Sequence, residues 1–288
     1  MSNQNHNILA IEVGSSRVKV GWFPSAGACA SEKPAANLPI VAAPRTLPEP
    51  SAVFRAEHRR DEAEWTGEVA ARLSELLLPE GTICIVAAVH RAAAESLQSR
   101  VLKRQSLSQV IKLTRSDVSV EANVNEPSRI GIDRLLNALA ANHIRQAGRP
   151  AIVVDVGTAM TVNLISADGV FQGGAILAGP MTALRALHSA TSSLPLLGRD
   201  VLEAAPAPVG KSTEHAMAAG AYWGAIGAAR ELIARTATAC RQSPEVFLTG
   251  GASAGLAPHI GFGEEPARHI PDLILSGIRL AAEGILAR

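Results

Sequence analysis

Ala151–Ile176, AIVVDVGTAMTVNLISADGVFQGGAI, is the stretch that decides the fold. An apolar run ends at Val154, the segment Asp155-Val156-Gly157-Thr158 follows, and a second apolar run covers Met160–Ile165. This pattern predicts two strands joined by a tight turn, with a third strand over Val170–Ile176. A carboxylate and a hydroxyl at such a strand end can present an anion and a donor to a metal-bound phosphate group.

The same pattern occurs near the N-terminus, about half the chain earlier. Ile11–Ser16, IEVGSS, aligns with Val154–Ala159, VDVGTA, and each copy ends an apolar strand in a carboxylate followed by Val and Gly. Either copy alone is typical of an ordinary hairpin turn. Two copies at equivalent places predict an internal duplication. We therefore expect an α/β protein of two related lobes, over residues 1–118 and 119–288.

A third glycine-rich turn follows the strand predicted at Glu245–Leu248, where the chain reads Thr249-Gly250-Gly251. Glycine lets the backbone come close to a ligand, and successive backbone N–H groups form an anion-binding concavity. Two hairpins facing each other from the two lobes would hold the β- and γ-phosphates of ATP. The adenosine or the α-phosphate would then lie against the paired glycines.

Apolar periodicity and turn residues predict the remaining elements. Residues 24–52 are rich in Ala, Pro and Ser and indicate an irregular connection, with one edge strand near Leu38–Ala42. Further strands are expected at Ile8–Val13, Arg17–Phe23, Thr82–Val89 and Val110–Leu113, and helices at Asp61–Leu78, Ala92–Leu102, Gly131–Ile144, Pro180–Ala190, Ser212 or Thr213 to Ala239, and Asp272–Leu286.

Composition excludes several classes of protein. A net charge of +1 gives no electrostatic case for nucleic acid or an anionic membrane as partner. Cys29, Cys84 and Cys240 have no CxxC spacing, which favours reduced thiols in a cytoplasmic protein. We find neither a signal-peptide pattern nor an apolar run long enough for a transmembrane helix. The HExxH and GxxxxGK[ST] motifs are absent, which argues against a zinc-protease site and a P-loop.

The three turns resemble the actin/hexokinase/Hsp70 superfamily of ATP-binding folds, and more narrowly the type III pantothenate kinase family. The narrower resemblance is densest over residues 120–251. The motifs that carry it are Ile11–Gly21, Gly131-Ile132-Asp133-Arg134, Val154–Thr161, Gly173–Ile176 with Gly179, Thr191–Pro195, Ser212-Thr213, Gly220 and Thr249–Gly251. The resemblance implies two duplicated actin/ribonuclease H-like lobes, each a mixed sheet flanked by helices.

The resemblance also implies an activity: ATP-dependent phosphorylation of pantothenate to 4'-phosphopantothenate, the first step of coenzyme A biosynthesis. It implies ATP, Mg²⁺ and a monovalent cation (K⁺ or NH₄⁺) as cofactors, and a cytoplasmic homodimer. The residues so implied are Asp133 as general base; Glu12, Val13, Gly14, Ser15, Ser16, Arg17, Val18, Lys19, Thr158, Gly250 and Gly251 for the nucleotide; Gly131, Ile132, Asp133, Arg134 and Thr213 for pantothenate; and Asp155 for the cation.

Simpler interpretations stand beside these roles. Asp133 is also an ordinary first-turn residue of a helix, and Thr213 an ordinary N-cap. Lys19 could be an exposed lysine of an edge strand. Gly220, Gly224 and Gly227 form a flat helix face that fits either a subunit interface or a contact within the chain.

Several positions depart from the family pattern. Glu12 replaces the usual Asp, Ser15-Ser16 replaces Asn-Thr, Asn163 stands where Asp is frequent, and Val124 occupies the place of an aromatic residue. Two alternatives therefore remain: a non-catalytic regulatory relative with the same fold, and a kinase for another small hydroxylated substrate such as a sugar.

Overall fold

The chain forms two compact units in a computed structural model that describes residues 6–25 and 46–287. Unit 1 comprises Met1–Ser119, Ser128–Ile144 and Ile274–Arg288, and unit 2 comprises Val120–Pro127 and Arg145–Leu273. The chain first leaves unit 1 next to the lobe boundary predicted at 118/119. It then returns for Ser128–Ile144, so the Gly-x-Asp-Arg motif, expected in the second lobe, packs with unit 1.

The sheet of unit 1 has the strand order β3-β2-β1-β4-β5. β2 is antiparallel to both of its neighbours, and β4 is parallel to β1 and β5. β4 is apolar along its length and β1 is apolar except at Glu12, as is typical of strands inside a sheet with both faces covered. The strands are β1 (Ile8–Val13), β2 (Arg17–Phe23), β3 (Ala52–Glu57), β4 (Ile83–Ala88) and β5 (Gln109–Lys112).

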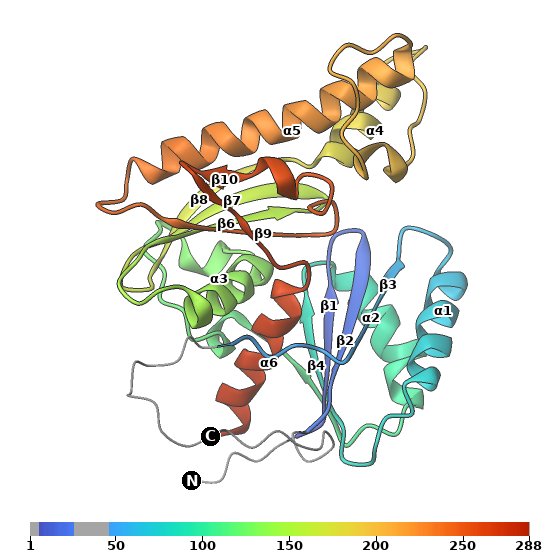
Figure 1. Cartoon of the computed structure of the whole chain (residues 1–288). Helices are drawn as coiled ribbons and strands as arrows, with labels where there is room; N and C mark the ends of the chain where they lie inside the picture. The colour runs from blue at the N-terminus through green and yellow to red at the C-terminus, as the bar shows by residue number, and fades with distance from the viewer. Residues whose placement is uncertain (1–5, 26–45, 288) are drawn as a thin grey trace, which may run out of the picture. The chain divides into compact units, whose positions relative to one another are not determined.

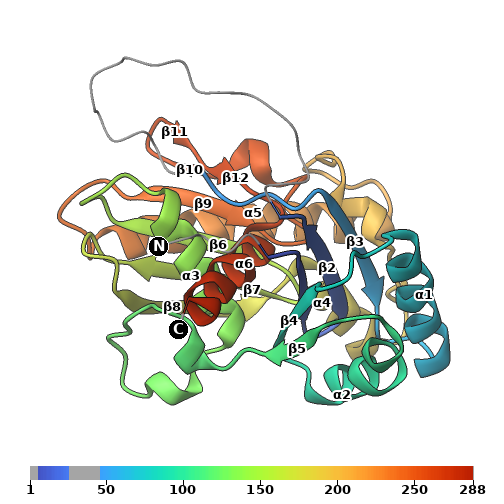
Figure 2. The ribbon, with the colours of Figure 1, turned by 90° about the horizontal axis from the view of Figure 1, so that it is seen from below.

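Helices cover both faces of this sheet. α1 (Glu62–Glu75) and α2 (Arg91–Arg100) lie on one side, and α3 (Ile132–Ile144) and α6 (Leu273–Leu286) on the other (Figures 1 and 2). α1 begins at Asp61, whose side chain accepts hydrogen bonds from two backbone N–H groups of the first turn. Its buried face is Trp65, Val69 and Leu73, three apolar residues at helical spacing.

The sheet of unit 2 repeats this topology with the order β12-β9-β6-β7-β8. β7 is antiparallel to both neighbours, while β9 is parallel to β6 and β12. β6 and β7 therefore correspond to β1 and β2, which confirms the predicted fold class of two duplicated mixed sheets. The strands are β6 (Ala151–Val156), β7 (Ala159–Ile165), β8 (Phe171–Ala178), β9 (Glu245–Thr249) and β12 (Arg268–His269), with β10 (Gly261–Phe262) and β11 (Glu265–Pro266) as a separate pair.

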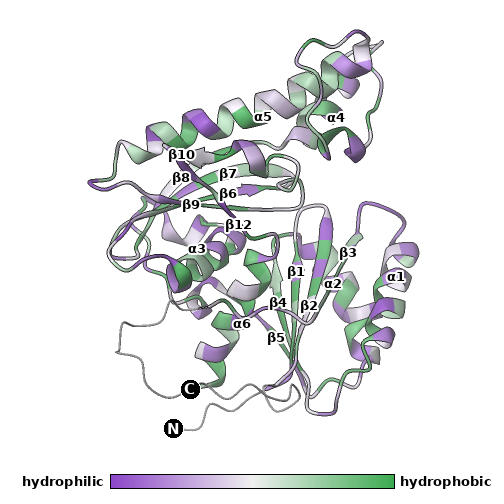
Figure 3. Cartoon of the chain, in the orientation of Figure 1, coloured by the Kyte–Doolittle hydropathy of each residue, from purple (hydrophilic) through white to green (hydrophobic). Residues whose placement is uncertain are grey.

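The long helix α5 (Thr213–Ala237) packs on this second sheet, and α4 (Pro180–Ala190) packs against α5. α5 buries Tyr222, Ile226, Ala229 and Ile233 with the apolar residues of β6, β7 and β9. Figure 3 shows the resulting alternation of green and purple along the helix. Short 3₁₀ turns connect elements at Leu102–Arg104, Arg115–Asp117, Pro127–Arg129, Arg199–Leu202 and Ala257–His259.

Two parts of the secondary-structure prediction need comment. β3 was not predicted, because its first residues continue the Ala- and Pro-rich connection. The edge strand predicted near Leu38–Ala42 lies outside the described residues. None of the described helices is both long and apolar enough to cross a membrane.

Candidate functional site

The first predicted phosphate turn joins β1 to β2 in unit 1. Glu12 and Lys19 face each other across the two strands, with Lys19 Nζ 3.6 Å from Glu12 Oε2. Glu12 is 9% exposed and Lys19 8% exposed, so this ion pair is largely withdrawn from water. Interpreting Lys19 as an exposed edge lysine is therefore wrong, because β2 lies between β1 and β3.

The longer side chain of Glu12 reaches over the turn that follows it. Gly14 N–H donates to Arg17 O at 2.9 Å, which closes the turn around Ser15 and Ser16. A Cβ on Gly14 would lie only 2.6 Å from Glu12 Oε1. Any side chain at position 14 would therefore displace the carboxylate that departs from the family pattern.

Asp133 lies in the first turn of α3, as predicted. Gly131 O accepts from Arg134 N at 3.1 Å, and a side chain on Gly131 would collide with Asp133 Oδ1. The helix dipole at this end favours the ionised carboxylate. Burial lowers the pKa of Arg134, and the neighbouring charge of Asp133 opposes that shift. Arg115 fixes the preceding loop by donating from Nε to Ile130 O.

The second phosphate turn and the paired glycines come together in unit 2. β9 runs parallel to β6, so Thr249 lies beside Asp155 and Gly250 lies beside Val156. Gly250 has φ +100°, and a Cβ there would strike Asp155 Oδ1 and the backbone of Val156. The Asp155 carboxylate therefore lies directly over the Gly250 backbone.

Thr158 forms the tip of this turn, and the start of α4 holds it in place. Its carbonyl accepts from Gly179 N at 3.0 Å and from Thr182 Oγ1 at 2.6 Å. Both lone pairs of that carbonyl are engaged. The contribution of Thr158 to a ligand must therefore come from its hydroxyl or its N–H.

Two hydrogen bonds in series, referred to below as the relay, link the Gly250 turn to Ser253 and His269. Ser253 Oγ donates to Gly250 O at 2.6 Å and lies 2.8 Å from His269 Nε2. Because Ser253 gives its proton to Gly250, its oxygen accepts from the N–H of His269. Burial lowers the pKa of His269, which favours the neutral ring in this relay.

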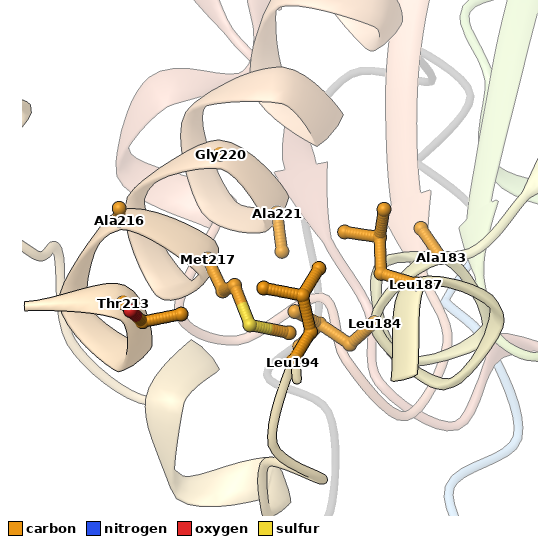
Figure 4. A pocket seen from close by; sticks show the side chains of 9 residues that line it. All are labelled: Ala183, Leu184, Leu187, Leu194, Thr213, Ala216, Met217, Gly220 and Ala221. Carbon is orange, nitrogen blue, oxygen red and sulfur yellow. The ribbon is translucent and has the colours of Figure 1, made fainter. Parts of the chain in front are cut away.

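A groove of about 490 Å³ lies between α4 and α5. Three of the sequence signatures meet there: Leu194, Thr213 and Gly220 all line it. Figure 4 shows the side chains of Leu184, Leu194 and Met217 converging, with Thr213 at one end. Thr213 is not the N-cap of α5, because the side chain of Ser212 accepts the bond from His215 N.

Two of the departing positions also have a defined place in unit 2. Asn163 is 1% exposed and donates from Nδ2 to Thr161 Oγ1 at 2.9 Å, and Thr161 is the cross-strand partner of Asp155. Val124 packs over Gly173, whose φ of +89° brings the two segments together.

Sequence reasoning did not select His58, Ser253 or His269. Each is a single polar residue in an otherwise ordinary segment, so only the folded chain shows its link to a turn. A Ser three residues after the Gly-Gly start was the one usable signal, since serine at that spacing often bonds back to the chain.

Several relatives named type III pantothenate kinase resemble this chain. The protein of Acidiphilium cryptum is 39% identical over 178 residues, covering 62% of this chain and 64% of the relative. That of Stenotrophomonas maltophilia (strain K279a) is 36% identical over 209 residues, covering 70% and 78%. The chain spans only 64% and 60% of the length of the Acidiphilium cryptum and Gluconobacter oxydans relatives.

Among solved structures, MreB5 of Spiroplasma citri bound to ADP aligns over 100% of both chains with a TM-score of 0.50. The identity is 9%, so this likeness supports the actin-like fold and nothing finer. The family model for type III pantothenate kinase matches residues 8–235, which include both phosphate turns and the Gly-x-Asp-Arg motif. The chain belongs to the type III pantothenate kinase family.

Proposed function

We propose that the protein transfers the γ-phosphoryl group of ATP to the primary hydroxyl of pantothenate, giving 4'-phosphopantothenate. The observation that carries this proposal is the family match over residues 8–235, which includes Asp133 in the first turn of α3. The product would enter coenzyme A biosynthesis.

In the proposed step, Asp133 accepts the proton of the pantothenate hydroxyl as that oxygen attacks the γ-phosphorus. The bond from the γ-phosphorus to the β–γ bridging oxygen breaks, and ADP leaves with the electron pair. Phosphoryl transfer relies on positioning and charge stabilisation, so the base must be ionised and fixed. The dipole of α3 supports the ionised form of Asp133, and the position of its carboxylate over the Gly131 backbone supports a fixed base.

The nucleotide is assigned to the three turns and pantothenate to the helix starts. The geometry of the β1–β2 turn supports this, since the Gly14–Arg17 hydrogen bond and the Glu12 carboxylate hold a tight turn around Ser15 and Ser16. Under this proposal Glu12 to Lys19, Thr158, Gly250 and Gly251 contact ATP, while Gly131 to Arg134 and Thr213 contact pantothenate.

The oxygen donors around Asp155 fit a hard cation. Its carboxylate lies over Gly250, and the Thr161 hydroxyl belongs to its cross-strand partner. Carboxylate and hydroxyl oxygens suit Mg²⁺ and K⁺ rather than a transition metal. We assign Asp155 to a monovalent cation, K⁺ or NH₄⁺. Bound Mg²⁺ would neutralise charge on the phosphates of ATP.

We further propose a cytoplasmic homodimer that associates through α5. Gly220, Gly224 and Gly227 are exposed, and apart from adjacent residues and the nearby backbone of α5 itself no described atom lies within 4 Å of a Cβ built on any of them. A contact within the described chain therefore does not explain this glycine face. Leu187 on α4 is 45% exposed and adds apolar surface nearby.

A non-catalytic regulatory relative is the second candidate. Glu12 and Asn163 favour it, since each changes a position where the family has Asp. The buried pairing of Glu12 with Lys19 argues for the enzyme, because it holds the carboxylate in a fixed place at the turn.

The test is a coupled assay of ADP release with pantothenate, with a panel of sugars, and without acceptor. We expect turnover with pantothenate as the acceptor, and none with the sugars or without an acceptor. The product should have the mass of phosphopantothenate, and the rate should fall when K⁺ or NH₄⁺ is replaced by Na⁺. Turnover with a sugar only would assign a different kinase. No turnover with any acceptor would favour the regulatory relative.

A further inference from the structure

The residue after β3, His58, contacts the first phosphate turn twice. Its backbone N–H donates to Ser16 O at 3.2 Å, and its ring nitrogen Nε2 lies 2.8 Å from Gly14 O. A carbonyl oxygen only accepts, so Nε2 carries the proton and donates. One residue directly after a neighbouring strand thus holds two carbonyls of the four-residue turn Gly14–Arg17.

The contact with Gly14 O fixes the direction of a group that the ligand would use. In a planar trans peptide, the carbonyl of one residue and the N–H of the next point in opposite directions. Holding Gly14 O toward His58 therefore turns the N–H of Ser15 to the opposite side of the turn. A backbone N–H that is oriented before binding is an efficient hydrogen-bond donor to phosphate, because no conformational entropy is lost in ordering it when the ligand binds.

The ring of His58 is itself held in place. His58 is 9% exposed, and its ring lies 4.8 Å from the ring of His90 and 6.0 Å from that of Trp65, centroid to centroid. His90 is fixed in turn because its Nδ1 accepts from Ala93 N at 3.1 Å, as the N-cap of α2. The helices of unit 1 thereby set the orientation of the turn through two histidines whose rings are in tilted contact.

We propose that His58 is a positioning residue for ATP: it holds the Gly14 carbonyl so that the Ser15 N–H faces the nucleotide phosphates. This inference rests on the proposed nucleotide role of the β1–β2 turn. It predicts an effect on ATP that does not extend to pantothenate.

The test compares His58→Phe, which keeps a ring of similar size but has no donor, with His58→Gln, whose side-chain amide can donate from a similar distance. Leu73→Ala serves as the control, since it opens the core of unit 1 without touching the turn. KM for ATP, KM for pantothenate and kcat are measured for each, with calorimetric titration of ATP and thermal unfolding in parallel.

We expect His58→Phe to weaken the affinity for ATP by about five- to tenfold, which is the usual contribution of one hydrogen bond. KM for pantothenate should stay within about twofold, and His58→Gln should recover most of the loss. Leu73→Ala should lower the melting temperature and leave KM for ATP unchanged. If His58→Phe lowers the melting temperature but leaves ATP affinity intact, the role of His58 is only structural and the inference is overturned.

Gly14→Ala separates this result from the proposed function. A methyl group there would lie 2.6 Å from Glu12 Oε1 and 3.3 Å from Arg17 O, so it must displace the Glu12 carboxylate and press on the turn. Weaker ATP binding in Gly14→Ala with no effect of His58→Phe overturns the positioning role alone. Unchanged ATP binding in Gly14→Ala overturns the nucleotide role of the turn, and the inference with it.

Discussion

Among single residues, Gly250 is the one whose lack of a side chain matters most clearly for unit 2. Its φ of +100° strains any other residue, and the Asp155 carboxylate occupies the place of a Cβ. We expect Gly250→Ala to lower the free energy of unfolding by at least about 3 kcal/mol, because strain and collision add. Urea denaturation measures this change.

Gly263→Ala is the matched control for that substitution. Gly263 also has a positive φ, +60°, but no described atom lies within 4 Å of its Cβ position. Only the backbone strain of about 1 kcal/mol should remain there. If Gly250→Ala and Gly263→Ala lower the free energy of unfolding equally, the close approach of Asp155 to Gly250 does not contribute to the cost of the substitution.

His269 predicts a pH dependence of stability. Its pKa lies below the ordinary value of 6.5 because the ring is partly buried. On acidification, the His269 ring is therefore protonated at a higher pH in the unfolded chain than in the folded protein. The free energy of unfolding should fall as the pH drops below about 6.5, until the ring is also protonated in the folded protein. His269→Gln should give a shallower fall over this range in unfolding curves at several pH values. An unchanged slope would contradict the relay.

The residues that could be predicted from sequence are those with a local reason to be where they are. Asp133 lies in the first turn of a helix, and Asp155 and Gly250 lie at the ends of apolar strands, so the local sequence predicts their places in the fold. Lys19 could not be placed in the same way. Its burial depends on β3, which covers β2 and which the composition of the preceding segment obscures.

At the scale of the elements, the β1–β2 hairpin carries a buried ion pair. Removing one partner leaves an uncompensated charge, so Glu12→Gln and Lys19→Met should each cost about 3 kcal/mol. The double variant should cost less than the sum, with a coupling energy of about 1–3 kcal/mol in a double-mutant cycle. Additive losses would show that Glu12 and Lys19 do not stabilise each other.

The duplication is the element-scale feature that the sequence predicts best. Two aligned turns were enough to predict two related lobes, and the strand order that the two sheets share comes from the structure. Helix starts were less certain, since Ser212 rather than Thr213 caps α5. The two-residue strands β10, β11 and β12 have no periodicity to detect, so their pairing becomes visible only in the fold.

At the scale of the whole molecule, the compact units do not follow the order of the chain. α3 and most of α6 pack in unit 1 although unit 2 separates them in sequence. In unit 1, Gly277 lets α6 approach the backbone at Leu136 so closely that a Cβ would strike it. Periodicity predicts that each helix has an apolar face, but not which sheet that face covers.

The dimer proposed through α5 makes a prediction at this scale. Gly224→Leu should give a monomer in sedimentation velocity, because the new side chain fills the flat face without meeting other described atoms of the chain. Gly67→Leu adds the same side chain to an exposed helical glycine of α1 with equally open surroundings. It should leave the dimer intact. A dimer in both variants would exclude this face of α5 as the interface.

We propose above that this chain phosphorylates pantothenate with Asp133 as the base. The most direct measurement is single-turnover transfer of labelled γ-phosphate from ATP to pantothenate by wild-type protein and by Asp133→Asn. We expect the wild type to form labelled phosphopantothenate, and the variant to be at least about 100-fold slower, the usual contribution of a general base. The variant should keep its melting temperature and its affinity for ATP. Transfer at the wild-type rate by Asp133→Asn would contradict the account.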